Sequence, residues 1–228
     1  MHVLYEDNHL LIVEKPVNMP VQSDSSGDLD LLTAAKNYIK EKYQKPGNVY
    51  LGLVHRLDRP VGGAIVFART SKAASRLADQ LRRHQIKRQY LAVVHGQVTS
   101  TNATLTDYLY KGRAKNQSYV VPSDHSQAKL AKLSYHVLQQ NADYALLQVE
   151  LATGRSHQIR VQLAHQGHPL YGDQKYGADV NQVGQQIALW AHSLSLIHPT
   201  TKEAISVTSQ PPINAAPWQQ FAKMIEAK

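Results

Sequence analysis

Short strand-like segments bounded by turn residues dominate this sequence and constrain its fold most strongly. The clearest lie at residues 10–13, 64–67, 87–96, 130–138, 144–151 and 187–197. They do not alternate regularly with helices, as the strands of a parallel βαβ protein do. We therefore expect an α+β fold built on a largely antiparallel sheet, with residues 130–138 and 144–151 paired around the turn at Asn141.

Four segments have the spacing or the end signals of helices. Residues 29–43 and 71–81 carry apolar side chains at three- and four-residue intervals, and Pro217 opens a C-terminal helix. We expect Ser71 to cap the second helix, with Ala74, Leu77, Ala78 and Leu81 on its apolar face. A short helix capped by Ser156 is expected to end at Gly167.

Composition narrows the class of protein. A chain of 228 residues can bury a sizeable core, and we expect one domain over residues 1–228. It has no cysteine, so thiolate zinc sites and a cysteine nucleophile are excluded. No long apolar run opens the chain, which favours the cytoplasm and gives no reason to expect a membrane partner.

The charge balance points to a polyanionic partner. Twenty-five Lys and Arg against 17 Asp and Glu give a formal charge of +8, and nucleic acid is the leading candidate. Two groups of basic residues stand out: Arg82, Arg83, His84, Lys87 and Arg88, and then Lys111, Arg113 and Lys115.

The stretch Leu53–Thr70 holds the clearest candidate for chemistry. Asp58 lies between Arg56 and Arg59, and the glycines at 62–63 follow before an apolar strand. Cations beside a carboxylate favour its ionised form, so Asp58 has the setting of a catalytic group. From these residues alone, an Asp beside two Arg is more often a turn residue or part of a surface ion pair than a catalytic group.

A second cluster follows the strand at 144–151. On the helix expected after Ser156, His157 and Arg160 share one stripe, and Arg155 and Arg160 are candidates to face a cleft. Asp173, in a turn-rich loop, is the other candidate carboxylate. The histidines at 157, 165 and 168 fit no zinc-site spacing, so we expect no metal.

These segments together resemble the RluA-like family of RNA pseudouridine synthases. The string HRLD with its glycine-rich turn is similar to the family signature HRLDxxTSG, although Val61 and Gly62 stand where Thr and Ser are usual. Further likenesses are the opening VLYEDNHLLIVEKPVNMPV, the strand KRQYLAVVHG, GRSHQIRVQLA with Gln162 in place of His, HPLYGDQKYG, and LWAHSLSLIHPTTKE. They cover about residues 3–210.

The resemblance implies a fold, a reaction and roles for particular residues. The fold is a mixed sheet in two halves with flanking helices, without the separate S4 domain of many relatives. The reaction isomerises a uridine of rRNA or tRNA and needs no cofactor. Asp58 would be the catalytic residue, Arg160 its partner, and Tyr90 the ring that stacks on the target base.

The remaining basic residues are candidates for RNA contacts. Arg56 would fill the gap left by a flipped uridine, and the phosphates would meet Arg82, Arg83, Lys87, Arg88, Arg155 and His157. Lys15 is expected to be a phosphate contact or a solvated surface lysine. No obligatory protein partner is indicated, and we expect a monomer.

Two other functions are compatible with the sequence. One is a catalytically inactive RNA-binding protein of the same fold, favoured by the changed residues Val61 and Gly62. The other is a basic hydrolase or nuclease that uses the histidines with Asp173.

Overall fold

The computed structural model describes residues 1–112 and 116–227. Arg113 and Lys115, which belong to the second basic group, lie outside the described residues. The chain divides into two compact units. Unit 1 holds Met1–Arg88 and Ala191–Ser209, and unit 2 holds Gln89–Trp190 and Gln210–Lys228.

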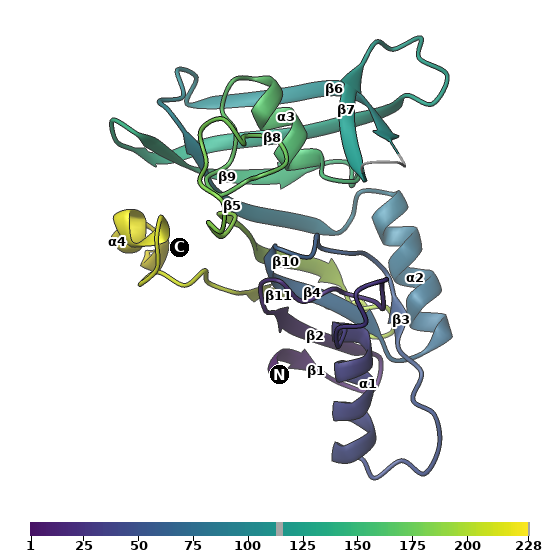
Figure 1. The fold of residues 1–228 in the computed structure, drawn as a ribbon. Helices are drawn as coiled ribbons and strands as arrows, with labels where there is room; N and C mark the ends of the chain where they lie inside the picture. The colour runs from purple at the N-terminus through teal and green to yellow at the C-terminus, as the bar shows by residue number, and fades with distance from the viewer. Residues whose placement is uncertain (113–115, 228) are drawn as a thin grey trace. The chain divides into compact units, whose positions relative to one another are not determined.

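Unit 1 is a sheet with helices (Figure 1). Its strands follow the order β1 (His2–Glu6), β2 (Leu10–Lys15), β4 (Gly62–Ala68) and β10 (Leu189–Ile197), with β11 (Ala204–Thr208) on β10 and β3 (Gly52–Leu53) on β4. The pairs β1/β2, β2/β4, β3/β4 and β10/β11 are antiparallel. The helices are α1 (Leu31–Lys42) and α2 (Ser71–Arg82).

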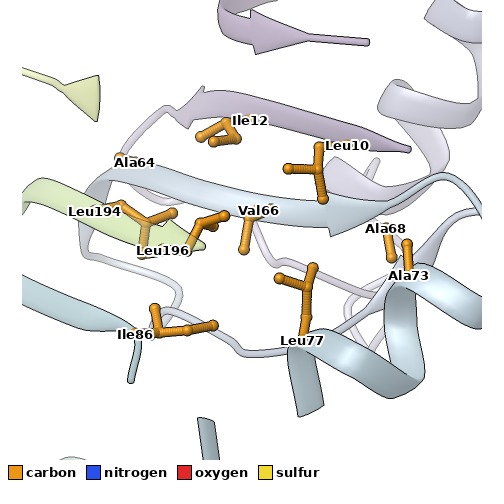
Figure 2. Packing of buried hydrophobic residues seen from close by; sticks show 10 residues of the cluster. All are labelled: Leu10, Ile12, Ala64, Val66, Ala68, Ala73, Leu77, Ile86, Leu194 and Leu196. Carbon is orange, nitrogen blue, oxygen red and sulfur yellow. The ribbon is translucent and has the colours of Figure 1, made fainter. Parts of the chain in front are cut away.

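The core of unit 1 forms where α2 packs on the sheet. Alternate residues of a strand point to the same face, and Figure 2 shows this arrangement: Leu77 of α2 lies near Val66 of β4, with Leu10 and Ile12 of β2 and Leu196 of β10 around them. All five side chains are buried. This packing gives β4, which follows the Asp58 segment, a rigid position.

In unit 2, the neighbouring strands all run antiparallel. The order is β5 (Lys87–His95), β9 (Tyr144–Leu151), β8 (Lys129–Gln140), β6 (Asn102–Gly112) and β7 (Gln117–Val121). Helix α3 (Gln158–His165) packs on one face, where Val161 meets Leu109 and Ala131. A 3-10 turn (Trp218–Phe221) and α4 (Ala222–Glu226) end the chain.

The α+β class, the predominance of antiparallel strands and the hairpin of β8 and β9 are confirmed. Gly167 also follows α3 with a positive φ of 83°, as expected for a C-terminal glycine. No helix in the described residues is long and apolar enough to cross a membrane.

The predicted helix starts were wrong in detail. Thr70, not Ser71, caps α2, because its hydroxyl accepts the Ala73 N–H at 3.1 Å. Ala78 is exposed, and the buried positions of α2 are Ala73, Leu77 and Gln80. Helix α3 begins without a side-chain cap.

Ser156 is engaged differently from the prediction. Its carbonyl accepts the hydroxyl of Ser118 at 2.7 Å. The N-terminal position of α3 is taken by His157 in the left-handed conformation, at φ 55°. A serine that turns its backbone toward a neighbouring strand is not placed to close the first turn of the helix.

Candidate active site

Backbone groups hold the segment that carries Asp58, between β3 and β4. The Val61 N–H donates to the Asp58 carbonyl at 3.0 Å and closes a turn. The Val66 N–H donates to Nε2 of His55 at 3.2 Å. The Arg59 carbonyl accepts the Lys15 ammonium at 2.9 Å. The carboxylate therefore sits on a segment tied to β2 and β4.

Glycine is required at the end of this turn. Gly63 has a φ of 114°, and a Cβ there would lie 2.3 Å from the carbonyl oxygen of Ala191 on β10. A side chain would break that close approach. Val61, which stands where the family has Thr, is buried with 2% of its surface exposed, so an apolar side chain fills this position.

Lys15 is fully buried, so the prediction of a phosphate contact or surface lysine was wrong. Its ammonium donates to the carbonyls of Pro16 at 2.9 Å, Met19 at 2.6 Å and Arg59 at 2.9 Å. Burial lowers the pKa of Lys15 to about 7, with Asp58 raising it and Arg59 lowering it. The field of this interior amine thus reaches the candidate carboxylate.

The two arginines beside Asp58 behave differently. Arg56 is exposed. The guanidinium of Arg59 binds the loop before α1: it pairs with Asp28, lies 3.5 Å from Asp24 and donates to the Ser26 hydroxyl at 2.9 Å. Arg59 therefore fastens this acidic loop to the Asp58 segment, a role that the sequence pattern did not indicate.

The first basic group lies at the end of α2 and the start of β5. The side chains of Arg82 and Arg83 are 76% and 63% exposed, although both pair with Asp79. Lys87 is exposed and Arg88 is half-buried. This surface leaves at least three cationic groups open to a polyanion.

Arg88 also acts on His55 of the HRLD string. Burial first, and then the charge of Arg88, lower the pKa of His55 to about 3. Nδ1 of His55 is buried without a hydrogen-bond partner. The neutral ring, accepting the Val66 N–H, serves as a support of the segment.

In unit 2, Arg160 and His157 meet at one tyrosine. Arg160 forms a bidentate pair with Asp173, both N–O distances being 2.8 Å. Its guanidinium lies 5.2 Å from the ring centre of Tyr176, and Nδ1 of His157 lies 2.7 Å from the Tyr176 hydroxyl. The same hydroxyl accepts the Ser118 N–H at 2.7 Å.

Asp173 stabilises the turn of its own loop. Its side chain, buried with 1% of its surface exposed, accepts the N–H groups of Lys175 at 2.9 Å and Tyr176 at 3.2 Å as well as Arg160. These contacts fix both carboxylate oxygens. They place Asp173 in the support of the loop, which weakens the hydrolase interpretation.

Two further candidates also lie in unit 2. Tyr90 is on β5 opposite Val149, with 6% of its surface exposed. Arg155 is exposed, and its Nε donates to the Leu130 carbonyl at 2.8 Å.

The candidates are distributed over both units. Unit 1 carries Asp58, Arg56, Arg82, Arg83, Lys87 and Arg88; unit 2 carries Tyr90, Arg155, His157 and Arg160. Within unit 2 the structure joins Arg160 and His157 through Tyr176. The pairing of Asp58 with Arg160 stays a prediction. Over residues 1–112 and 116–227, no three His, Cys, Asp or Glu residues gather as a metal site would need.

Known proteins are similar to this chain over most of its length. The family model described as RNA pseudouridylate synthase matches residues 9–165. An uncharacterized RNA pseudouridine synthase of Bacillus subtilis, YhcT, is 35% identical over 209 residues, which make up 90% of this chain and 67% of the relative.

A relative named ribosomal large subunit pseudouridine synthase C, from Buchnera aphidicola, is 32% identical over 212 residues, covering 90% of this chain and 65% of that protein. The chain therefore spans about two thirds of the length of these relatives.

A solved structure, human RNA pseudouridylate synthase domain containing 4, superposes with a TM-score of 0.79 at 21% identity. The match covers 99% of this chain and 93% of that one, and it confirms the fold. With the family model matching most of its length and relatives at more than 30% identity, the chain belongs to the RNA pseudouridylate synthase family, whose members are isomerases that act on RNA.

Proposed function

We propose that this chain converts a specific uridine of rRNA or tRNA to pseudouridine in the cytoplasm, with Asp58 as the catalytic carboxylate and without a cofactor. The observation that carries the proposal is the anchoring of Asp58. Its segment is held by Lys15, by the Val66 N–H and by the close approach of Gly63 to β10. Catalytic groups work best on segments held rigidly in one geometry.

The reaction requires few groups. The bond between N1 of uracil and C1′ of the ribose breaks, the ring turns, and C5 bonds to the same carbon. C5 then gives up its proton, and N1 ends with one, so atoms and charge balance. An ionised Asp58 can act as nucleophile or as base in these reaction steps, and either role uses only side chains.

Other residues take supporting roles in the proposal. Tyr90 stacks on the uracil while it is detached, and Arg160 pairs with Asp58 in the bound complex. Arg56, exposed two residues before Asp58, fills the space left when the uridine leaves its stack, a step that costs a few kcal/mol.

Ribosomal RNA is the first substrate to try. Relatives from Buchnera and Haemophilus are named ribosomal large subunit pseudouridine synthase C, and the net charge of +8 suits a polyanion. Transfer RNA is the second. Mapping pseudouridines in RNA from cells with and without this protein identifies the site.

The substitution Asp58→Asn tests the assignment directly. It keeps the size of the side chain and removes its charge, so isomerisation should fall to background while RNA affinity stays within about twofold, because the phosphate contacts lie elsewhere. A single-turnover assay in excess EDTA, with folded RNA, measures the first quantity and filter binding measures the second.

Asp143→Asn, on the exposed turn between β8 and β9, is the matched control and should keep full activity. Wild-type turnover in Asp58→Asn would refute the role of Asp58. Tight binding with no isomerisation by the unaltered chain, on any RNA, would instead favour the inactive RNA-binding protein.

A further inference from the structure

One face of the sheet in unit 2 exposes a group of apolar and aromatic side chains that the proposed reaction does not use. We define the tyrosine patch as Tyr108, Tyr110, Tyr119, Val121 and Leu130. The register places Tyr108 opposite both Val121 and Leu130, and Tyr110 opposite Tyr119. Residues opposite each other in antiparallel strands point to the same face, so the five side chains are neighbours.

This face is the reverse of the one that packs on α3. The alternate residues of the same strands, Leu109, Val120 and Ala131, contact Val161 of α3. Tyr90 lies opposite Val149, which lies opposite Tyr135 on β8, and Tyr135 alternates with the residues of the patch face. The tyrosine patch and the proposed stacking residue Tyr90 therefore lie on opposite faces of one sheet.

The rings of the patch are open to solvent. Tyr108, Tyr119 and Leu130 are 37%, 38% and 42% exposed. His125, from the loop after β7, lies with its ring centre 4.8 Å from that of Tyr110 and extends the aromatic surface. A contiguous exposed group of this kind marks an interaction surface more often than scattered apolar residues do.

Two basic side chains lie beside Leu130, at one side of the tyrosine patch. Lys132 is exposed two residues after Leu130 on the same face, and Arg155 binds the Leu130 carbonyl. The acids nearby are Asp124 in the loop beside His125 and Glu150, opposite Ser134 on the same face. Cations thus flank the side of the patch at Leu130, where a backbone phosphate would lie.

We propose that the tyrosine patch binds unpaired bases of the RNA, away from the target uridine. Aromatic rings on adjacent strands stack the bases of single-stranded RNA in several unrelated folds, and Lys132 and Arg155 contact the phosphates between them. The inference rests on the proposed function in that it takes the substrate to be RNA, and it adds a second contact for single-stranded segments that flank the modified site.

Binding of uridine-free RNA tests the patch alone. The probe is a labelled, unstructured oligonucleotide of adenosine and cytidine, which offers no target to the active site. The fluorescence anisotropy of this probe, titrated with the full chain, gives the affinity of the chain for it. The double variant Tyr108→Ala/Tyr119→Ala should bind it at least about tenfold more weakly, since each stacked base contributes ~1–3 kcal/mol.

Two variants control for the loss of a tyrosine. Tyr119→Phe keeps the ring and should keep the affinity within about twofold. Tyr50→Ala removes a tyrosine that is 50% exposed in unit 1 and should also leave binding unchanged. Unaltered affinity of the double variant, with its thermal midpoint retained, would overturn the proposal.

An isomerisation assay distinguishes failure of this inference from failure of the proposed function. On an RNA with unpaired flanks the double variant should show a raised KM and an unchanged kcat, and on a minimal target hairpin both should be unchanged. If the chain isomerises no RNA and the double variant still binds the probe more weakly, the proposed function fails and the patch stands. If isomerisation occurs and KM does not change, the patch fails alone.

Two further measurements start from the unaltered chain. Photo-cross-linking of the same probe should label peptides containing residues 108–121, and labelling confined to other peptides would overturn the proposal. Sedimentation should show a concentration-independent mass. Self-association that Tyr119→Ala abolishes would assign the patch to a second copy of the chain instead.

Discussion

Backbone atoms hold several residues in and around the candidate site. Lys15 binds three carbonyls, His55 accepts one N–H, and Asp173 accepts two. Backbone groups keep their chemistry whatever the side chain beside them. Substitutions such as Val61 and Gly62 can therefore change the family signature without changing these contacts.

His55 makes stability depend on pH in the acid range. Its pKa is about 3 in the folded protein and roughly 6.5 in an unfolded chain. Between these values the unfolded chain binds a proton that the folded protein does not. The free energy of unfolding from this group is therefore fully present above about pH 6.5 and falls as the pH drops toward 3.

We expect His55→Gln to weaken this acid dependence. Urea unfolding at about pH 4.5 and about pH 7 measures it, and the difference between the two pH values should shrink in the variant. His165→Gln, on an exposed position of α3, is the control and should retain the wild-type difference. The same difference in His55→Gln would show that another group causes the acid sensitivity.

For single residues, the sequence indicated candidate roles more readily than it indicated which side chains are buried. The glycine at 63 could be singled out because a turn of that kind needs it. The carboxylate at 58 could be singled out because cations flank it. Lys15 was misjudged because its acceptors include Arg59, 44 residues away, and only the folded chain brings them together. The one signal available was its place at the end of an otherwise apolar run.

Among the elements, helix α2 offers a clean test of capping. Thr70 accepts the Ala73 N–H, so Thr70→Ala should lower the free energy of unfolding by about 1 kcal/mol. Ser71→Ala, at the first helical residue, should change it much less, because its hydroxyl is not at the capping position. Chemical denaturation of both variants decides between them, and a larger loss in Ser71→Ala would contradict the assignment.

Strands were easier to predict than helix ends. Apolar residues that alternate, or that form a short continuous run between turn residues, are typical of strands, so β4, β8, β9 and β10 could be found from their apolar residues. Adjacent Thr70 and Ser71 can both cap a helix, and the choice depends on backbone angles that composition does not encode. The left-handed conformation of His157, at φ 55°, is likewise not encoded by composition.

For the whole molecule, the excess of positive charge should appear as salt-dependent RNA binding. Removing one cation that neutralises a phosphate reduces the slope of log affinity against log salt by roughly 0.7 for single strands. The triple variant Arg82→Gln/Arg83→Gln/Lys87→Gln should therefore reduce that slope by about 2. Filter binding over a range of salt concentrations measures it.

Lys40→Gln, on the exposed side of α1, is the control for total charge. It should change the slope little if contacts with the RNA, and not the net charge, determine binding. An unchanged slope in the triple variant would remove the end of α2 from the RNA-binding surface.

The contact between Lys15 and Arg59 also makes the geometry of the Asp58 segment depend on the pairing of β2 with β4. Lys15 ends β2, which pairs along its whole length with β4, and its ammonium holds the carbonyl next to Asp58. The Asp58 segment therefore cannot settle before β2 has docked. A chain in which the N-terminal hairpin has opened carries the carboxylate without its geometry, so the proposed activity should require β2 to be paired with β4.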